Sequence, residues 1–172
     1  MENKINYLEN GATKFKGHSK KEGRYDIKMK AITIKQPWAT LIAVGEKKFE
    51  TRSWKTAHRG QLAIHAGKSI DKDAYEEFED VLKRHGYNSI KDLPTGVVLA
   101  TVDLIECHQV IEDKFPIMYQ AKTDKGATIH KTEYLYGDFS KGRYGWELMN
   151  VQVFDTPVVA KGQLSLWNWE EE

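Results

Sequence analysis

Three charged residues stand close enough in the sequence to form one polar group. Glu50 and Arg52 are two apart on a predicted strand, so their side chains share a face, and Lys47 reaches the same side from the preceding turn. We expect the Glu50 carboxylate, flanked by two cations, to be ionised. Such a carboxylate accepts hydrogen bonds from the amino edge of a base, and the cations bind phosphate or polarise a carbonyl. A solvated cluster of surface ion pairs is the alternative.

The segment Gln36-Pro37-Trp38 is a second candidate for ligand binding. A strand that runs into a Pro-led helix leaves amides at the helix start, where an anion can bind. The Gln36 amide offers both a donor and an acceptor to a base edge. Trp38 is either a base-stacking residue or, as is more common on an amphipathic helix, a core residue.

An aromatic and basic run follows in a predicted loop, with Trp54, Lys55, His58 and Arg59. Aromatic faces and cations together are typical of sites for single-stranded nucleic acid. The alternative is a solvated loop with one anchoring Trp. We take Trp54 and Arg59 as candidate ligand contacts.

Four residues outside this loop complete the candidate ligand-binding set: His65, Lys68, Arg143 and Tyr144. His65 lies on the predicted strand face opposite its apolar neighbours, where it lines a site or is a hydrogen-bonded interior histidine. Lys68 follows at the end of that strand. Arg143 opens a late strand as a phosphate or base contact, and Tyr144 is a candidate for stacking.

Several other classes of site are not predicted. The only cysteine, Cys107, allows no intrachain disulfide and no Cys-based zinc site, and we expect it to be a buried small residue. No histidines stand at the spacing of a metal site, and neither a phosphate-binding glycine loop nor a serine nucleophile elbow is present. We therefore expect no metal and no cofactor.

The composition is that of an ordinary globular domain, with 172 residues, 40% hydrophobic and 30% charged. No membrane-spanning run or signal peptide is visible, so we expect a cytoplasmic protein. The net charge of +1 does not by itself predict a nucleic-acid partner. Residues 1–30, however, carry eight basic and four acidic residues, so this head has a net charge of +4. We predict a flexible basic extension over 1–29, which is either a disordered tail or an arm that follows phosphates, and a folded domain over 30–172.

The candidate residues must be positioned by many short strands and about two helices, which predicts an α+β fold. Helical spacing from Trp38 ends at Gly45, and a second helix is expected over 71–85 before Gly86. The region 111–141 looks irregular. Strands are expected at the following residues: 30–35, 48–54, 60–66, 97–107, 144–155 and 158–167.

Taken together, these motifs resemble the ASCH domain over roughly residues 30–168. The resemblance rests on Gln-Pro-Trp before a helix, then Gly45-x-Lys47-x-x-Glu50-x-Arg52, and later Gly142-Arg143-Tyr144. It implies a PUA-like fold, a small β-barrel with flanking helices and a ligand cleft. It also implies binding of RNA, single-stranded nucleic acid or a nucleotide.

Some proteins of this family are N4-acetylcytidine amidohydrolases, in which a Lys and a Thr of the motif work with a later Glu. Lys47 matches that Lys, and Glu50 stands where those enzymes have Thr. Glu106 or Asp103 is the candidate for the later acid. Three functions remain open: nucleic-acid or nucleotide binding, hydrolysis with Lys47, Glu50 and Glu106 as catalytic residues, and a protein-interaction domain that uses 111–141 and the basic head.

Overall fold

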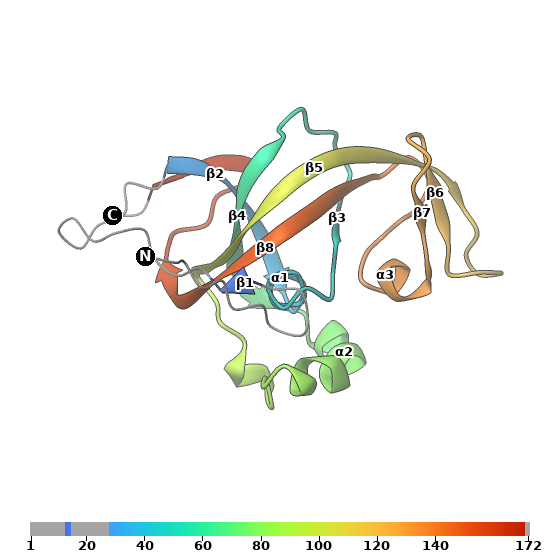
Figure 1. Ribbon diagram of the computed structural model, residues 1–172. Coiled ribbons are helices and arrows are strands. Elements are labelled where there is room, and N and C mark those ends of the chain that lie inside the picture. The colour runs from blue at the N-terminus through green and yellow to red at the C-terminus, as the bar shows by residue number, and fades with distance from the viewer. Residues whose placement is uncertain (1–12, 15–27, 171–172) are drawn as a thin grey trace, which may run out of the picture. The chain divides into compact units, whose positions relative to one another are not determined.

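The computed structural model of the chain describes residues 13–14 and 28–170 (Figure 1). The extension predicted for 1–29 therefore lies almost wholly outside the described residues, and the domain boundary at residue 30 stays a prediction. In chain order the described elements are β1 (Thr13–Lys14), β2 (Lys28–Gln36), α1 (Trp38–Ala43), β3 (Phe49–Arg52), β4 (Gly60–Ile70), α2 (Lys72–Arg84), the 3-10 helix η1 (Ile90–Asp92), β5 (Val97–Asp113), β6 (Ala121–Thr123), β7 (Thr128–Ile129), α3 (Lys131–Leu135), β8 (Tyr144–Val159) and β9 (Leu166–Glu170).

The strands form a mixed sheet, which confirms the α+β class. Its strand order is β1-β8-β5-β4-β2-β9, with β2 parallel to β4 and antiparallel to β9. The expected closed β-barrel is wrong, because the strand order ends at β1 and at β9, and no pairing among the described strands joins these ends. An alternating sequence predicts that a segment is a strand but not which strand it pairs with, and closure depends on the partners.

Residue contacts divide the chain into two compact units. Unit 1 contains the described residues up to Gly45, then Gln61–Val102 and the described residues from Asn150 onward. Unit 2 contains Glu46–Gly60 and Asp103–Met149. The strands β5 and β8 each contribute residues to both units.

In unit 1 the helix predicted over 71–85 is confirmed as α2. The side chain of Asp71 caps its start by accepting a hydrogen bond from the Ala74 N–H at 3.1 Å. Ala74 and Leu82 on its apolar face are buried. Gly86 follows the helix with φ of 88°, a conformation that glycine adopts without a steric penalty.

The apolar core of unit 1 includes the tryptophans at the end of the chain. Trp167 and Trp169 on β9 are buried against Ala31, Ala63 and Val98 from neighbouring strands. The last strand is therefore held to unit 1 by the packing of its two tryptophans.

In unit 2 the region 111–141 is more regular than expected. The end of β5 pairs with β6, β6 pairs with β7, and α3 follows (Figure 1). Val110, Ala121, Ile129 and Phe139 form the apolar core here. These strands are only two or three residues long, too short for an alternating pattern to be recognised in the sequence.

The end of the chain also differs from the prediction. The strand expected over 144–155 is confirmed and reaches Val159 as β8, but a separate strand over 158–167 is wrong. Residues 160–165 connect β8 with β9, and Ser165 in this connection has φ of 57°, which does not fit an extended strand.

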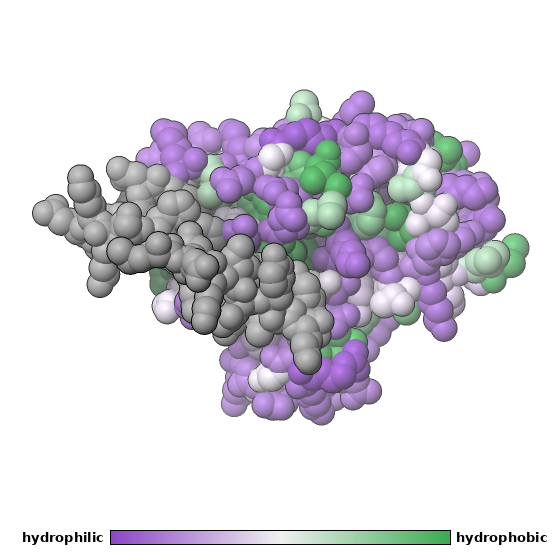
Figure 2. All heavy atoms as spheres, in the orientation of Figure 1, coloured by the Kyte–Doolittle hydropathy of each residue, from purple (hydrophilic) through white to green (hydrophobic). Residues whose placement is uncertain are grey.

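Hydrophilic residues cover most of the described surface in the face shown in Figure 2, and apolar residues are exposed in small separate groups. No described helix is long and apolar enough to cross a membrane.

Candidate functional site

Lys47 is a charged residue enclosed by protein in unit 2. Only 1% of its surface is exposed, and its Nζ donates hydrogen bonds to the carbonyl oxygens of Phe49 and, at 2.7 Å, of Tyr136. Burial lowers the pKa of Lys47 from its usual value, while the carboxylates of Glu50 and Glu133 act in the opposite direction. Lys47 thus joins the start of β3 to a residue 89 positions later in the chain.

Glu50 completes the charged group between the two cations. Its Oε1 lies 3.0 Å from the Nε of Arg52, and its Oε2 lies 3.8 Å from the Nζ of Lys47. The side chains of Glu50 and Arg52 are 11% and 24% exposed, so Arg52 is the member that solvent reaches most. The expected meeting of these three side chains is confirmed, and we name them the charged trio.

The strand pairing fixes where the charged trio lies. β3 runs antiparallel to the start of β8, with Glu50 opposite Trp146 and Arg52 opposite Tyr144. Tyr144 and Arg52 are therefore neighbours on adjacent strands, as a shared site requires. This proximity was not predictable, because the sequence does not give the partner of β3.

Glu133 on α3 is a residue that the sequence analysis missed. Its two carboxylate oxygens accept hydrogen bonds from the backbone N–H groups of Lys48 and Phe49, each at 2.9 Å. Burial raises the pKa of Glu133, opposed by Lys47 and by these two amides. The carboxylate anchors the turn that carries Lys47, and no local pattern in the sequence indicates this role.

The segment after α3 also packs directly on β3. The Thr51 hydroxyl accepts a hydrogen bond from the Asp138 N–H at 3.1 Å. A Cβ at Gly137 would lie 2.8 Å from the Cγ2 of Thr51, so only glycine fits there without a shift of its neighbours. Gly137 is thus explained by close approach to the strand that carries Glu50 and Arg52.

The loop after β3 holds two of the predicted ligand contacts. Trp54 is half-buried and packs edge-on against Trp146, with ring centroids 4.7 Å apart. Arg59 donates from Nη1 to the carbonyl oxygens of Thr56 at 3.1 Å and His58 at 2.8 Å. The loop therefore folds around the Arg59 guanidinium.

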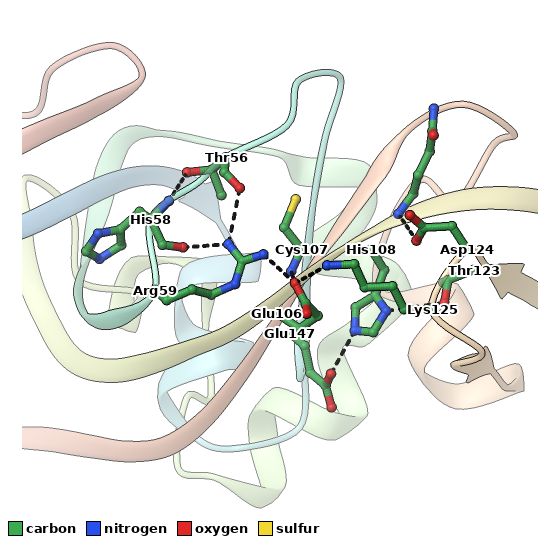
Figure 3. Close-up of polar contacts among 11 residues, drawn as sticks. Thr56, His58, Arg59, Glu106, Cys107, His108, Thr123, Asp124, Lys125 and Glu147 are labelled. Atoms are coloured by element: carbon green, nitrogen blue, oxygen red, sulfur yellow. Dashed lines mark hydrogen bonds and ion pairs between the residues drawn. The ribbon is translucent and has the colours of Figure 1, made fainter.

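The predicted catalytic acid, Glu106 on β5, lies against this loop. Its Oε1 accepts hydrogen bonds from Arg59 Nη2, from the Cys107 N–H and from Lys125 Nζ (Figure 3). These donors lower the pKa of Glu106 to about 2, with Lys125 the largest cause. The carboxylate thus has three donors inside the protein, and Cys107 is buried as expected.

Arg143 and Tyr144 also belong to unit 2, at the start of β8. The Nε of Arg143 lies 3.1 Å from both the carbonyl oxygen and the Oδ2 of Asp138. Tyr144 is half-buried. Their roles as phosphate and stacking contacts stay predictions.

The remaining candidates, Gln36, Trp38, His65 and Lys68, lie in unit 1. Gln36 is fully buried, and both ends of its amide are used within the protein: Oε1 accepts from the Thr40 N–H at 3.0 Å, and Nε2 donates to the carbonyl of residue 94 at 2.7 Å. Trp38 is half-buried at the start of α1. The amides expected to bind an anion thus include one that is already bonded to Gln36.

His65 is a buried interior histidine in unit 1. Its Nε2 lies 3.1 Å from the carbonyl oxygen of Ala160, and its ring packs edge-on against Trp167, with centroids 5.7 Å apart. Burial lowers the pKa of His65. A Cβ at Gly162 would lie 2.5 Å from the His65 ring, so only glycine fits at this position without a shift of its neighbours. Lys68, on the same strand, is exposed.

Apolar side chains between β5 and β6 are also exposed. Phe115, Ile117, Met118 and Tyr119 have exposed fractions between 43% and 91%. They belong to the region proposed as a protein contact, and that role stays a prediction. Within the part of the chain that the structure describes, no group of three or more His, Cys, Asp or Glu residues could hold a metal ion.

Residues 32–158 match the family model of the ASCH domain, a segment that contains every candidate residue of both units. The chain is 36% identical over 95 residues to activating signal cointegrator 1 of Mus musculus and 34% identical over 97 residues to the same protein of Homo sapiens. Each match covers 52% of this chain and 16% of the relative's own length.

Proposed function

The chain belongs to the ASCH domain family, whose members are generally thought to bind RNA, and from this premise we propose that unit 2 binds single-stranded RNA or a nucleotide at the charged trio. The observation that carries the proposal is a contact network of three charged groups, in which Lys47 and Glu50 are buried and Arg52 is partly exposed. Buried ion pairs contribute little net stability compared with apolar residues of similar size. Such a cluster is therefore a good candidate for a functional site.

The surroundings of the charged trio fit a polyanionic ligand. Residues 46–60 carry five basic and two acidic residues, which gives this segment a net charge of +3. In the proposal Arg52 contacts a phosphate or a base oxygen, with Arg143 as a second cation. Tyr144, opposite Arg52 in the strand pairing, and the half-buried Trp54 are the stacking residues. Lys47, with 1% of its surface exposed, contributes by holding Glu50 rather than by touching the ligand.

Fluorescence anisotropy with labelled single-stranded RNA and with nucleoside triphosphates, at low salt, tests this proposal. We expect the affinity to fall as the salt concentration rises. Binding releases counterions from the RNA, and this release is less favourable at high salt. The Arg52→Gln variant is expected to lose roughly tenfold in affinity, since a charge-assisted contact is removed. The matched control is Arg84→Gln, an exposed arginine on α2 of unit 1 with the same charge change, which should stay within about twofold.

Two results would count against binding at the charged trio. The absence of any affinity for RNA or nucleotides at low salt would reject the function. Equal losses of affinity in Arg52→Gln and Arg84→Gln would reject the charged trio as the binding site. Urea unfolding of Arg52→Gln must accompany the titration, because Glu50 loses its nearest cation in this variant.

Hydrolysis of a modified nucleoside is a second candidate, and it is favoured by the burial of Lys47, which lowers the pKa of this side chain. A lysine base needs such a shift to be neutral near pH 7. Incubation with N4-acetylcytidine, comparing the wild type with Glu50→Gln and Lys47→Ala, decides between the two functions. Turnover that depends on both residues would support hydrolysis, and no turnover would leave binding as the function of the site.

A further inference from the structure

Three hydrogen-bond donors in unit 2 converge on a single carboxylate oxygen. Glu106 Oε1 receives Arg59 Nη2, the Cys107 N–H at 2.7 Å and Lys125 Nζ at 2.5 Å. Figure 3 shows that Arg59 and Lys125 approach Glu106 from opposite sides. Two cations and a backbone N–H around one anionic oxygen are the arrangement that proteins use for phosphate oxygens.

Two of these donors, Arg59 and the Cys107 N–H, do not depend on Glu106 for their position. Arg59 is fixed by the carbonyl oxygens of Thr56 and His58, which bind Nη1, while Nη2 faces Glu106. Thr56 is itself buried, and its hydroxyl accepts a hydrogen bond from the His58 N–H at 3.1 Å. The Cys107 N–H belongs to strand β5. Removal of the carboxylate therefore leaves at least two donors aimed at the same point.

Glu106 and the two cations around it are partly open to solvent. Its side chain is 32% exposed, and the side chains of Arg59 and Lys125 are 34% and 37% exposed. An incoming anion can therefore reach the two cationic donors from solvent. A carboxylate that occupies such a group of donors competes with any phosphate that approaches it.

We propose that Arg59, Lys125 and the Cys107 amide form a phosphate-binding site that Glu106 occupies in the free protein, and that a phosphate group of the nucleic-acid ligand displaces this carboxylate. The identity of the ligand rests on the proposed function, whereas the phosphate site itself does not. The apparent affinity is reduced by the fraction of molecules in which Glu106 holds the donors. Glu106 thus sets how tightly unit 2 holds phosphate.

The chain offers a matched control for this idea. Glu112 also contacts two lysines, with Lys114 Nζ at 3.6 Å and Lys122 Nζ at 3.1 Å, but no backbone amide or arginine of the described residues joins them. Glu106→Gln and Glu112→Gln change the net charge equally and release two cations each. A difference between the two variants therefore reports the geometry of the donors and not the overall charge.

The first measurement is anisotropy with labelled single-stranded RNA for the wild type and both variants. We expect Glu106→Gln to bind roughly tenfold more tightly than the wild type, as it would if Glu106 held the donors in nine molecules of ten. Glu112→Gln should change the affinity by less than about twofold. The dependence of log K on log salt should steepen by about 0.7 for each additional phosphate that the variant neutralises. In the double variant Arg59→Gln/Glu106→Gln the increase in affinity should disappear.

The second measurement uses inorganic pyrophosphate and separates this proposal from the proposed function. Suppose that the wild type fails to bind RNA while Glu106→Gln binds pyrophosphate more tightly than Glu112→Gln does. This result would support the phosphate site and reject RNA binding as the function. Equal affinities of the two variants for both probes would overturn the phosphate site. Should Glu106→Gln fail to fold, NMR of the wild type decides, because pyrophosphate at the site must shift the Cys107 amide resonance and absence of that shift refutes the site.

Discussion

The substitution Lys47→Met tests whether the buried lysine holds unit 2 together. Methionine has a similar length, but it donates no hydrogen bond. The carbonyl oxygens of Phe49 and Tyr136 lose their donor, and Glu50 keeps only Arg52 as a neighbouring cation. One of the ties between β3 and the segment after α3 is removed, so the free energy of unfolding must fall.

The expected loss in the free energy of unfolding depends on how well the charge of Glu50 is still compensated in the variant. Removing one partner of a buried ion pair costs about 3–5 kcal/mol, because an uncompensated charge stays behind. Arg52 lies 3.0 Å from Glu50 and continues to compensate it, which places the loss at the lower end, about 3 kcal/mol. With a urea dependence of about 2 kcal/mol per M, the unfolding midpoint should fall by about 1.5 M.

Urea unfolding at pH 7, followed by circular dichroism, measures this loss. The matched control is Lys48→Met, an identical change at the next residue, whose side chain is exposed. Its free energy of unfolding should stay within about 0.5 kcal/mol of that of the wild type. If Lys47→Met is as stable as Lys48→Met, the hydrogen bonds of Lys47 contribute nothing to the fold, and its role as an internal tie is refuted.

Two further changes give equally definite expectations. Gly162→Ala places a Cβ 2.5 Å from the His65 ring, so the free energy of unfolding should fall by about 2 kcal/mol in urea titrations, and an unchanged midpoint would contradict the packing. Glu106 has a pKa of about 2 in the folded protein against an ordinary 4.5, so the unfolded state binds more protons between these pH values and stability is lost as pH falls through them. Thermal unfolding should therefore decline less steeply below pH 4.5 in Glu106→Gln than in the wild type, and parallel curves would contradict the shifted pKa.

Local patterns in the sequence predicted the elements that carry the charged trio. Alternation along a strand places Glu50 and Arg52 on one face, and their ion pair at 3.0 Å confirms it. Gly45 follows α1 with φ of 83°, which agrees with a glycine at the end of a helix. These features depend on residues a few positions apart.

What the sequence could not predict depends on residues far apart in the chain. The carbonyl of Tyr136 that receives Lys47 and the carboxylate of Glu133 that binds the amides at the start of β3 belong to a region that looked irregular. Gln36 has the chemistry to bind a base edge, but its burial and its bond to Thr40 depend on how the elements pack. The open sheet likewise follows from strand pairing, which no local pattern encodes.

NMR of the side-chain N–H groups tests the binding of RNA at the charged trio most directly. On addition of single-stranded RNA, we predict shifts of the Arg52 Nε–H and Trp54 indole resonances in unit 2. The indole of Trp169, 3% exposed in the core of unit 1, serves as the internal reference and should not move. Shifts confined to residues of unit 1, with Arg52 and Trp54 unchanged, would contradict the assignment of the site.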